Sequence, residues 1–322
     1  MLRSPDLVGK SQDSLREAFG KSLILLAEDY PSLVVLDADV AGGTGVHHFR
    51  KNFPDRFIQC GIAEQNMISV AAGMAETGLI PIVTTFAVFL LRAYEQVRLS
   101  VAYSQMNVKL VGSHCGLDVG PDGGSAQCLE DIAAFRAIPN MSVIVPASPI
   151  EINQATRFII EHKGPIYMRS GRSPLEECLD NSYKFEFGKG KYLSRGSDLT
   201  IISCGVCTGR SIQVVKDLKE LDINVELINM STIKPIDQKI IIESAKRTSK
   251  VVTVEDHSII GGLGSAVAEV LSEYHPTPLK RIGVKDTFGE SGEPDELACK
   301  YGIDQVSIKN TIINWLKNET KG

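Results

Sequence analysis

Short apolar segments alternate with longer amphipathic stretches along most of the chain, and the two patterns predict different elements. The apolar segments are rich in Val, Ile and Leu without polar alternation, which is typical of strands buried on both faces. In the first half of the chain these strands are expected at 33–39, 80–85, 107–113, 141–146 and 165–169. The helices between them are expected at 11–27, 63–77, 86–103, 128–137 and 150–161. This alternation predicts a parallel sheet with helices on both faces.

The pattern lapses over residues 173–194, where Pro, Gly, Asn and charged residues gather, and then resumes. Further strands are expected at 199–204, 223–228 and 251–255, with helices at 209–220, 264–272 and 306–317. We therefore expect two consecutive parallel-sheet α/β domains, residues 1–178 and 195–322, joined by a linker at 179–194.

Polar residues directly after a strand carry more weight than others, because ligands of open α/β sheets bind beyond the carboxyl ends of the strands. Four such clusters occur, and all belong to the first domain. They are Asp37-Ala-Asp39 with Gly42-Gly43-Thr44, Thr84-Thr85-Phe86, Ser113-His114 and Arg169-Ser-Gly-Arg172. The first domain is therefore where we expect the functional site.

The stretch GIAEQNM at 61–67 places Glu64 in the first turn of an apolar helix. The helix dipole favours an ionised carboxylate there. A half-buried carboxyl can instead hold a proton and share it with a ring nitrogen. A glutamate with no chemical duty is the simpler interpretation when Glu64 is considered alone.

Two further stretches accompany it. TFAVFLLRAY at 85–94 spaces Phe86 and Phe89 three residues apart, so that their rings could flank a flat heterocycle or simply belong to the core. The loop SHCGLDVGPDGG at 113–124 is polar, rich in glycine and too long for a simple turn, which is common in functional loops.

Composition narrows the class of protein. The 322 residues are 43% hydrophobic and 23% charged, with a formal net charge of −5, which argues against a non-specific nucleic-acid binder. The longest charge-free apolar stretch falls short of the roughly 18–20 residues of a membrane helix, and the charged N-terminus lacks an apolar signal core. We expect a soluble cytoplasmic protein.

The seven cysteines are scattered along the chain. Cys204 and Cys207 have redox spacing, although buried structural thiols are the favoured interpretation.

The ordered set GIAEQN, TFAVF, GPDG and RAIPN resembles the C-terminal half of transketolase, as found in split, two-subunit enzymes of this thiamine-diphosphate-dependent family. The resemblance runs from about Ser14 to the GGLGSAVAE stretch at 261–269. It implies a pyrimidine-binding domain followed by the transketolase C-terminal domain. It also implies a transferase that moves a two-carbon ketol unit between a ketose phosphate and an acceptor.

The resemblance assigns roles to residues of this chain. Glu64 matches the acid that activates the cofactor pyrimidine, a proton relay of general acid–base type. The residues matched to cofactor binding are Glu64, Phe86, Phe89, Asp39, Val40 and Arg92. Asp122 and His114 join Glu64 as catalytic candidates, with Asp122 facing a sugar hydroxyl. Arg16 and Arg172 match substrate-phosphate contacts, as guanidinium groups suit phosphate oxygens; Arg169 is the alternative to Arg172.

The chain lacks the Gly-Asp-Gly motif and paired asparagines that hold the cofactor diphosphate through Mg²⁺ or Ca²⁺ in this family, so no metal ligands are expected in it. Half a cofactor site implies an N-terminal transketolase subunit of roughly 250–300 residues that carries the other half. We expect an α2β2 complex with self-dimerisation of this chain, inert without its partner.

Three departures from the family fall on the substrate side. Ala126 stands where the family has a histidine, the Gly42-Gly43-Thr44 run replaces a phosphate-binding serine, and Arg92 replaces a tyrosine, as in deoxyxylulose-phosphate synthases. In the second domain, the turn 261–264 could cradle phosphate, although close packing is favoured. Asp256-His257 is interpreted as a turn-capping pair. The resemblance gives this domain a mainly structural and dimerising role.

Several alternatives stay open. The same pair of domains occurs in the β-subunit of 2-oxo acid dehydrogenases, although Asp122 and the phosphate-binding arginines favour sugar phosphates. The chain could also be a deoxyxylulose-phosphate-synthase-like enzyme, a ketol transferase of specialised metabolism with an unusual donor or acceptor, or a non-catalytic regulatory paralogue. The donor and the acceptor are not predicted by the sequence.

Overall fold

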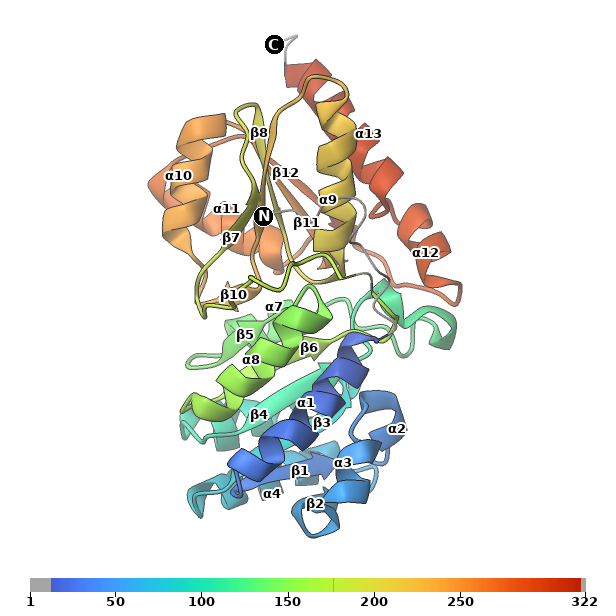
Figure 1. Ribbon diagram of the computed structural model, residues 1–322, viewed down its shortest axis with the longest axis vertical. Helices are drawn as coiled ribbons and strands as arrows, with labels where there is room; N and C mark the ends of the chain where they lie inside the picture. The colour runs from blue at the N-terminus through green and yellow to red at the C-terminus, as the bar shows by residue number, and fades with distance from the viewer. Residues whose placement is uncertain (1–12, 176, 320–322) are drawn as a thin grey trace.

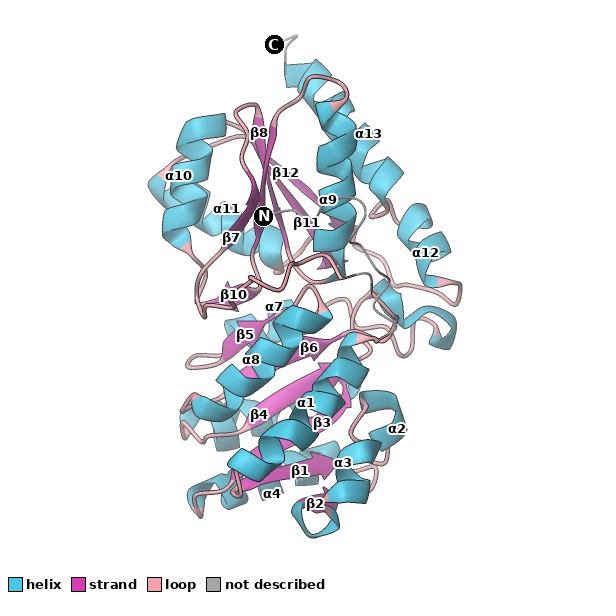
Figure 2. Ribbon diagram, viewed as in Figure 1, coloured by secondary structure: helices cyan, strands magenta, loops and turns pink. Residues whose placement is uncertain are grey.

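Two sheets, one above the other along the longest axis, form the framework of the molecule (Figure 1). This architecture comes from a computed structural model that describes residues 13–175 and 177–319. The first sheet has the strand order β10-β5-β6-β4-β3-β1-β2 and the second β12-β11-β8-β9-β7. Figure 2 shows helices packed around both sheets, which confirms the predicted α/β class.

The strands of the first sheet run parallel except for β10, which pairs antiparallel with β5. They are β1 (Leu33–Asp37), β2 (Phe57–Gln59), β3 (Ile80–Phe86), β4 (Lys109–Ser113), β5 (Ser142–Ile144), β6 (Ile166–Ser170) and β10 (Thr232–Lys234). Every residue of β1, β4 and β6 is buried. This explains why their sequences show no polar alternation.

Helices cover both faces of this sheet. They are α1 (Leu15–Asp29), α2 (Ala41–Thr44), α3 (His47–Asn52), α4 (Glu64–Glu76), α5 (Ala87–Leu90), α6 (Tyr94–Gln96), α7 (Asp131–Ala137) and α8 (Pro149–Glu161). In β1, Leu33 and Val35 pack in the core formed with α1 and α8, while Val34 and Leu36 pack on the α4 side. Figure 1 shows α1 and α8 side by side in front of the sheet.

The second sheet is parallel apart from β7, which pairs antiparallel with β9. Its strands are β7 (Lys191–Ser194), β8 (Leu199–Ser203), β9 (Val225–Asn229), β11 (Val251–Ser258) and β12 (Leu279–Val284). Its helices are α9 (Val206–Lys219), α10 (Gln238–Thr248), α11 (Leu263–Tyr274), α12 (Pro294–Lys300) and α13 (Gln305–Glu319).

The structure corrects several predicted elements. The single helix expected at 86–103 is a chain of short turns: α5, the 3-10 helix η3 (Leu91–Ala93), α6 and the π-helix η4 (Val97–Tyr103). The start of the helix expected at 11–27 lies outside the described residues; α1 begins at Leu15, with the Ser14 side chain accepting from Glu17 N. Strands β2, β7, β10 and β12 were not predicted, because most are too short or too polar at the surface to show a pattern.

The two domains share a core. β10 follows β9 in the chain, yet it joins the first sheet as an edge strand. One apolar cluster contains Leu36 and Val83 of the first sheet together with Ile241 and Val267 of α10 and α11. The predicted boundary at 179–194 therefore stays a prediction, since later residues complete the first sheet.

Candidate functional site

The carboxyl ends of β1, β3, β4 and β6 lie next to one another, because these strands are neighbours in the first sheet. The four polar clusters singled out in the sequence lie at the ends of these four strands, so they gather at one edge. Two of the loops contain a non-glycine residue with positive φ: Asp39 (65°) after β1 and His114 (58°) after β4. Such conformations are uncommon for non-glycine residues and cluster at functional sites.

Glu64 is the first residue of α4 and is 5% exposed. Its carboxylate accepts no hydrogen bond from the residues that the structure describes; the Arg92 Nε atom lies 3.9 Å from Oε2. The Arg92 side chain is 73% exposed, so this cation is largely solvated. A buried acid that lacks a donor is unusual in a folded chain, and it is suited to sharing a proton with a ligand.

Phe86 and Phe89 stack on each other with ring centroids 5.3 Å apart and planes 9° from parallel. That spacing is direct ring contact, so a third ring does not fit between them. In this arrangement the two rings do not flank a third one, and their role in binding a cofactor stays a prediction. Phe86 also stacks on the His114 ring, with centroids 3.7 Å apart and planes 15° from parallel.

His114 is buried and neutral. Burial, helped by the nearby Arg16 and Arg172 guanidinium groups, lowers its pKa to about 3. The Ser113 hydroxyl donates to the Gly43 carbonyl at 3.1 Å and lies 2.7 Å from His114 Nδ1. It therefore accepts from Nδ1–H, which leaves the lone pair of Nε2 free toward Asp122.

Charged side chains from three elements meet beside this imidazole. The Asp122 carboxylate lies 3.8 Å from His114 Nε2 and 3.5 Å from Arg172 Nη2. Arg172 also donates to the Val119 carbonyl at 2.7 Å, and Arg16 donates to the Gly43 carbonyl at 3.0 Å. Asp122 is exposed, whereas both arginines are half-buried. The arrangement offers two fixed cations and two acceptors to a polar, anionic ligand.

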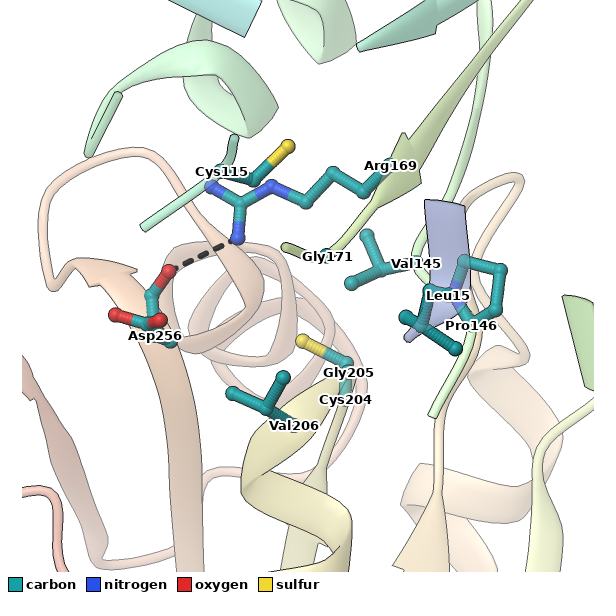
Figure 3. A pocket seen from close by; sticks show the side chains of 10 residues that line it. All are labelled: Leu15, Cys115, Val145, Pro146, Arg169, Gly171, Cys204, Gly205, Val206 and Asp256. Carbon is teal, nitrogen blue, oxygen red and sulfur yellow. Dashed lines mark hydrogen bonds between the residues drawn. The ribbon is translucent and has the colours of Figure 1, made fainter. Parts of the chain in front are cut away.

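Arg169 does not belong to this cluster. It is 6% exposed and forms a buried ion pair with Asp131, whose carboxylate accepts from Arg169 Nε at 2.7 Å and from Nη2. Its Nη1 donates to the Asp256 carbonyl at 2.9 Å, as Figure 3 shows. Asp131 therefore neutralises Arg169 between the two domains. Of the two arginines predicted to contact a phosphate, the structure therefore favours Arg172, which faces Asp122, over the already paired Arg169.

A hollow of about 340 Å³ adjoins the stack of aromatic rings. Asp39 and Val40, both predicted to bind a cofactor, line it together with Phe86. Sequence reasoning missed two other lining residues, His47 and Gln59. The Nδ1 atom of His47 is buried without a hydrogen-bond partner among the described residues.

Gln59 ties together the two loops at this hollow. Its Oε1 accepts from Asp39 N at 3.1 Å and Gly61 N at 2.9 Å, and its Nε2 donates to Asp37 at 2.8 Å. Burial raises the pKa of the Asp37 carboxyl, which the Gln59 donor counteracts. The amide therefore fixes both the Asp39 loop and the entry to α4. The signal that could have revealed it is its place at the end of β2, opposite Asp37.

The glycine turn of the second domain holds a carboxylate of the chain itself. Glu255 accepts from Leu263 N at 2.7 Å and Gly264 N at 2.8 Å, so the start of α11 has no room for phosphate. This agrees with the packing interpretation. Asp256 and His257 lie within β11 rather than in a turn, although Asp256 does accept from Leu117 N and Asp118 N.

Cys204 and Cys207 are both buried, and burial raises the pKa of the Cys207 thiol to about 12. Thiols of this kind are poor nucleophiles. Across residues 13–175 and 177–319, no group of three or more His, Cys, Asp or Glu side chains could hold a metal ion. No described helix has the length and apolar character needed to cross a membrane.

Two family descriptions match the chain: "Transketolase, pyrimidine binding domain" at residues 11–177 and "Transketolase, C-terminal domain" at 188–308. A putative transketolase C-terminal section of Methanocaldococcus jannaschii is 48% identical over 95% of this chain and 97% of its own length. A 6-deoxy-6-sulfo-D-fructose transketolase subunit of a Clostridium species is 39% identical, covering 95% and 96%.

Human transketolase is 35% identical over 92% of the chain, which spans 48% of that protein. Among solved structures, a split gene transketolase described as an inactive β4 tetramer superimposes with a TM-score of 0.87 at 43% identity, covering 94% of this chain and 97% of that one. Both the predicted family resemblance and the predicted pair of domain types are confirmed.

Proposed function

This chain belongs to the transketolase family, as the C-terminal section of a split enzyme, and we propose that it supplies the pyrimidine side of a thiamine-diphosphate site. The complete enzyme would move a two-carbon ketol unit from a ketose phosphate to an aldehyde acceptor. Thiamine-dependent ketol transfer is the general activity of the family. The donor class, the partner and the residue roles are the parts proposed for this protein.

The observation that carries the proposal is the Glu64 carboxylate, buried at the start of α4 without a hydrogen-bond donor from the described residues. Its protonated form fits a ring nitrogen such as N1′ of the cofactor pyrimidine. When bound, thiamine diphosphate supplies the carbon nucleophile that carries the ketol unit. Glu64 would hold the proton at N1′, while Phe89 would pack against the ring and Asp39 and Val40 would close the loop beside it.

The substrate side would be formed by the cluster around His114. Neutral His114 offers Nε2 as an acceptor for a substrate hydroxyl, and Asp122 offers a second acceptor 3.8 Å away. Arg16 and Arg172 face the same point and would hold the phosphate end of a ketose. This division keeps the cofactor contacts on α4, α5 and the loop after β1, and the substrate contacts on α1 and the loops after β4 and β6.

The missing half of the site would come from an N-terminal transketolase subunit that holds the diphosphate and its Mg²⁺ or Ca²⁺ ion. A similarity to split enzymes and one exposed side chain support a partner. The relative described as a transketolase C-terminal section and the split gene transketolase structure both match over 97% of their own length, and the loop before Glu64 presents Ile62 with 81% of its surface exposed. We propose an α2β2 assembly in which this chain also contacts its own copy.

A direct test is to purify the chain alone and together with an N-terminal section that carries Gly-Asp-Gly. Only the mixture should bind thiamine diphosphate in titration calorimetry and transfer a ketol unit from xylulose 5-phosphate to ribose 5-phosphate. Cofactor binding and turnover by the isolated chain would contradict the half-site proposal. A mixture that decarboxylates 2-oxo acids instead would favour the dehydrogenase alternative.

A specialised donor is a second candidate, favoured by Gly43 and Ala126. A Cβ atom at position 43 would lie 2.6 Å from Cε1 of Phe86, so this position has no room for a serine side chain, although Gly42 beside it does. Ala126 likewise offers no polar atom beyond Cα. The similar Clostridium subunit is described with a sulfo-sugar, which makes 6-deoxy-6-sulfo-fructose a suitable competitor of xylulose 5-phosphate in a donor assay. If Ala126→His leaves donor preference unchanged, this second candidate fails.

A further inference from the structure

The loop that carries Asp122 is held at its start by the second domain. Asp256 lies on β11, yet its carboxylate accepts from Leu117 N at 2.9 Å and from Asp118 N at 3.2 Å. Asp256 is buried. The backbone that leads toward Asp122 is therefore hydrogen-bonded to a strand more than 130 residues further along the chain.

The end of the same loop is held by Gln127. Its side chain is buried, and Nε2 donates to Gly120 O at 3.4 Å and to Glu290 O at 2.9 Å. Glu290 belongs to the segment 286–293, which connects β12 to α12. One amide group thus joins the middle of the Asp122 loop to the second domain.

Backbone packing reinforces this contact. A methyl group at Gly289 would collide with Gln127 Oε1, and one at Gly124 would lie 2.6 Å from the Gly289 carbonyl. The 286–293 segment is itself anchored, because Tyr301 donates to the Phe288 carbonyl at 3.1 Å and Lys300 pairs with Glu290. Two glycine-containing backbones therefore meet with no side chain between them.

Gln127 has a further property that packing alone does not explain. Its Oε1 atom is buried without a hydrogen-bond partner among the described residues. An unsatisfied buried oxygen costs stability, so an apolar residue of similar size would suit a purely structural position better. The amide is used here for its two donated hydrogen bonds.

We infer that the second domain sets the position of Asp122, with Gln127 and the 286–293 segment as the link. Gln127 is a positioning residue, because its hydrogen bonds go to the Gly120 and Glu290 carbonyls and it acts through the loop. The domain therefore has a role in the substrate site beyond structure and dimerisation. The ligand of Asp122 is part of the proposed function, so this part of the inference rests on it. The coupling between the loop and the second domain does not depend on the proposed function.

The coupling is tested in the isolated chain by hydrogen–deuterium exchange of peptides within 117–127. Gln127→Ala removes both hydrogen bonds and should speed exchange there roughly tenfold. Gly289→Ala should also speed it, because its methyl displaces Gln127. In the double variant the clash with Gln127 is absent and only a 3.0 Å approach to the end of the Leu117 side chain remains, so exchange should be little faster than in Gln127→Ala alone.

Gly209→Ala is the matched control, since a Cβ atom at this glycine of the second domain meets nothing within 4 Å. It should leave exchange in 117–127 unchanged. Additive effects of Gln127→Ala and Gly289→Ala, or exchange rates equal to wild type in both, would overturn the inference.

The consequence for the site is tested in the complex with the N-terminal subunit. Gln127→Ala should raise the KM for xylulose 5-phosphate roughly fivefold to tenfold while the dissociation constant of thiamine diphosphate stays unchanged. Gln127→Met, which keeps the side-chain volume, should likewise raise the KM and leave the dissociation constant of thiamine diphosphate unchanged. A parallel rise in both constants would point to general loss of structure and contradict a positioning role. If the wild-type complex transfers no ketol unit, the proposed function fails, and the exchange experiment still decides whether the second domain holds the loop.

Discussion

At the scale of single residues, the most informative side chains are those whose environment conflicts with their chemistry. Glu64 is an acid buried without a donor among the described residues, and His114 is an imidazole kept neutral between two arginines. Neither arrangement contributes to stability as a paired group would. Substitutions of Glu64 and His114 are therefore expected to affect activity more than stability, which makes both residues suitable for testing the proposed site.

Glu64→Gln should reduce kcat of the assembled enzyme by roughly 10²–10⁴-fold, because an amide cannot hand a proton to a ring nitrogen. The free energy of unfolding of the chain should change by about 1 kcal/mol or less, the usual size of a charge effect at a helix start. Steady-state kinetics and thermal melts measure the two quantities. Near wild-type turnover would remove the basis of the cofactor assignment.

The two arginines of the RSGR stretch should behave in opposite ways. Arg172→Ala should raise the KM for a ketose phosphate by roughly 10–100-fold, the loss of a charge-assisted hydrogen bond, with little effect on stability. Arg169→Ala leaves Asp131 buried and unpaired, so it should destabilise the chain by about 3–5 kcal/mol. Comparing KM values with urea midpoints for both variants checks the distinction; a stable Arg169→Ala protein with a raised KM would reverse it.

At the scale of elements, the glycine turn before α11 shows how a motif is used for packing. Glu255 fills the position that a phosphate would occupy and accepts two backbone N–H groups. The segment between Phe86 and Tyr103 shows a second effect: its amphipathic pattern is compatible with several helical pitches, and it folds as a series of short turns. Local sequence predicted the presence of these elements but not their internal geometry.

Gly262→Ala should destabilise the chain by about 1–3 kcal/mol, because the added methyl would collide with the Glu255 carboxylate. Gly73→Ala in α4 is the control: a Cβ atom there meets nothing within 4 Å, and alanine should raise stability by about 0.5–1 kcal/mol. Denaturant unfolding of both variants measures the difference. Equal stabilities would show that Glu255 is not held tightly in the turn.

At the scale of the whole molecule, buried ionisable groups between and beside the domains determine how stability depends on pH. Burial lowers the pKa of His257 to about 4, with Arg169 acting in the same direction, and that of His114 to about 3. The unfolded chain takes up protons at these residues near pH 6.5, whereas the folded chain does not. Their stabilising contribution is therefore full above pH 6.5 and is lost as the pH falls toward 4.

Glu255 acts in the opposite direction, since burial raises its pKa to about 7 and its contribution falls as the pH rises through that value. Glu255 and His257 contribute equally to wild type and to His114→Asn, so a comparison of the two proteins isolates the contribution of His114. The wild-type free energy of unfolding should fall more steeply between pH 6.5 and 4.5, by up to about 1.4 kcal/mol per pH unit for that group. Parallel curves for the two proteins would show that His114 ionises freely in the folded state.

The sequence by itself determined the α/β class, the placement of polar clusters at strand ends and the family, because these depend on local periodicity and on motifs read in order. The choice of Glu64, Phe86 and Asp122 as candidates came from the family motifs that these residues match. Tertiary structure alone decided that Arg169 pairs with Asp131 while Arg172 faces Asp122, that Phe86 stacks on His114, and that Gln127 reaches Glu290. The physical reason is distance through space: the partner of a charge or an amide depends on which remote segments the packed core brings within about 3–4 Å, and no pattern along the chain encodes that choice.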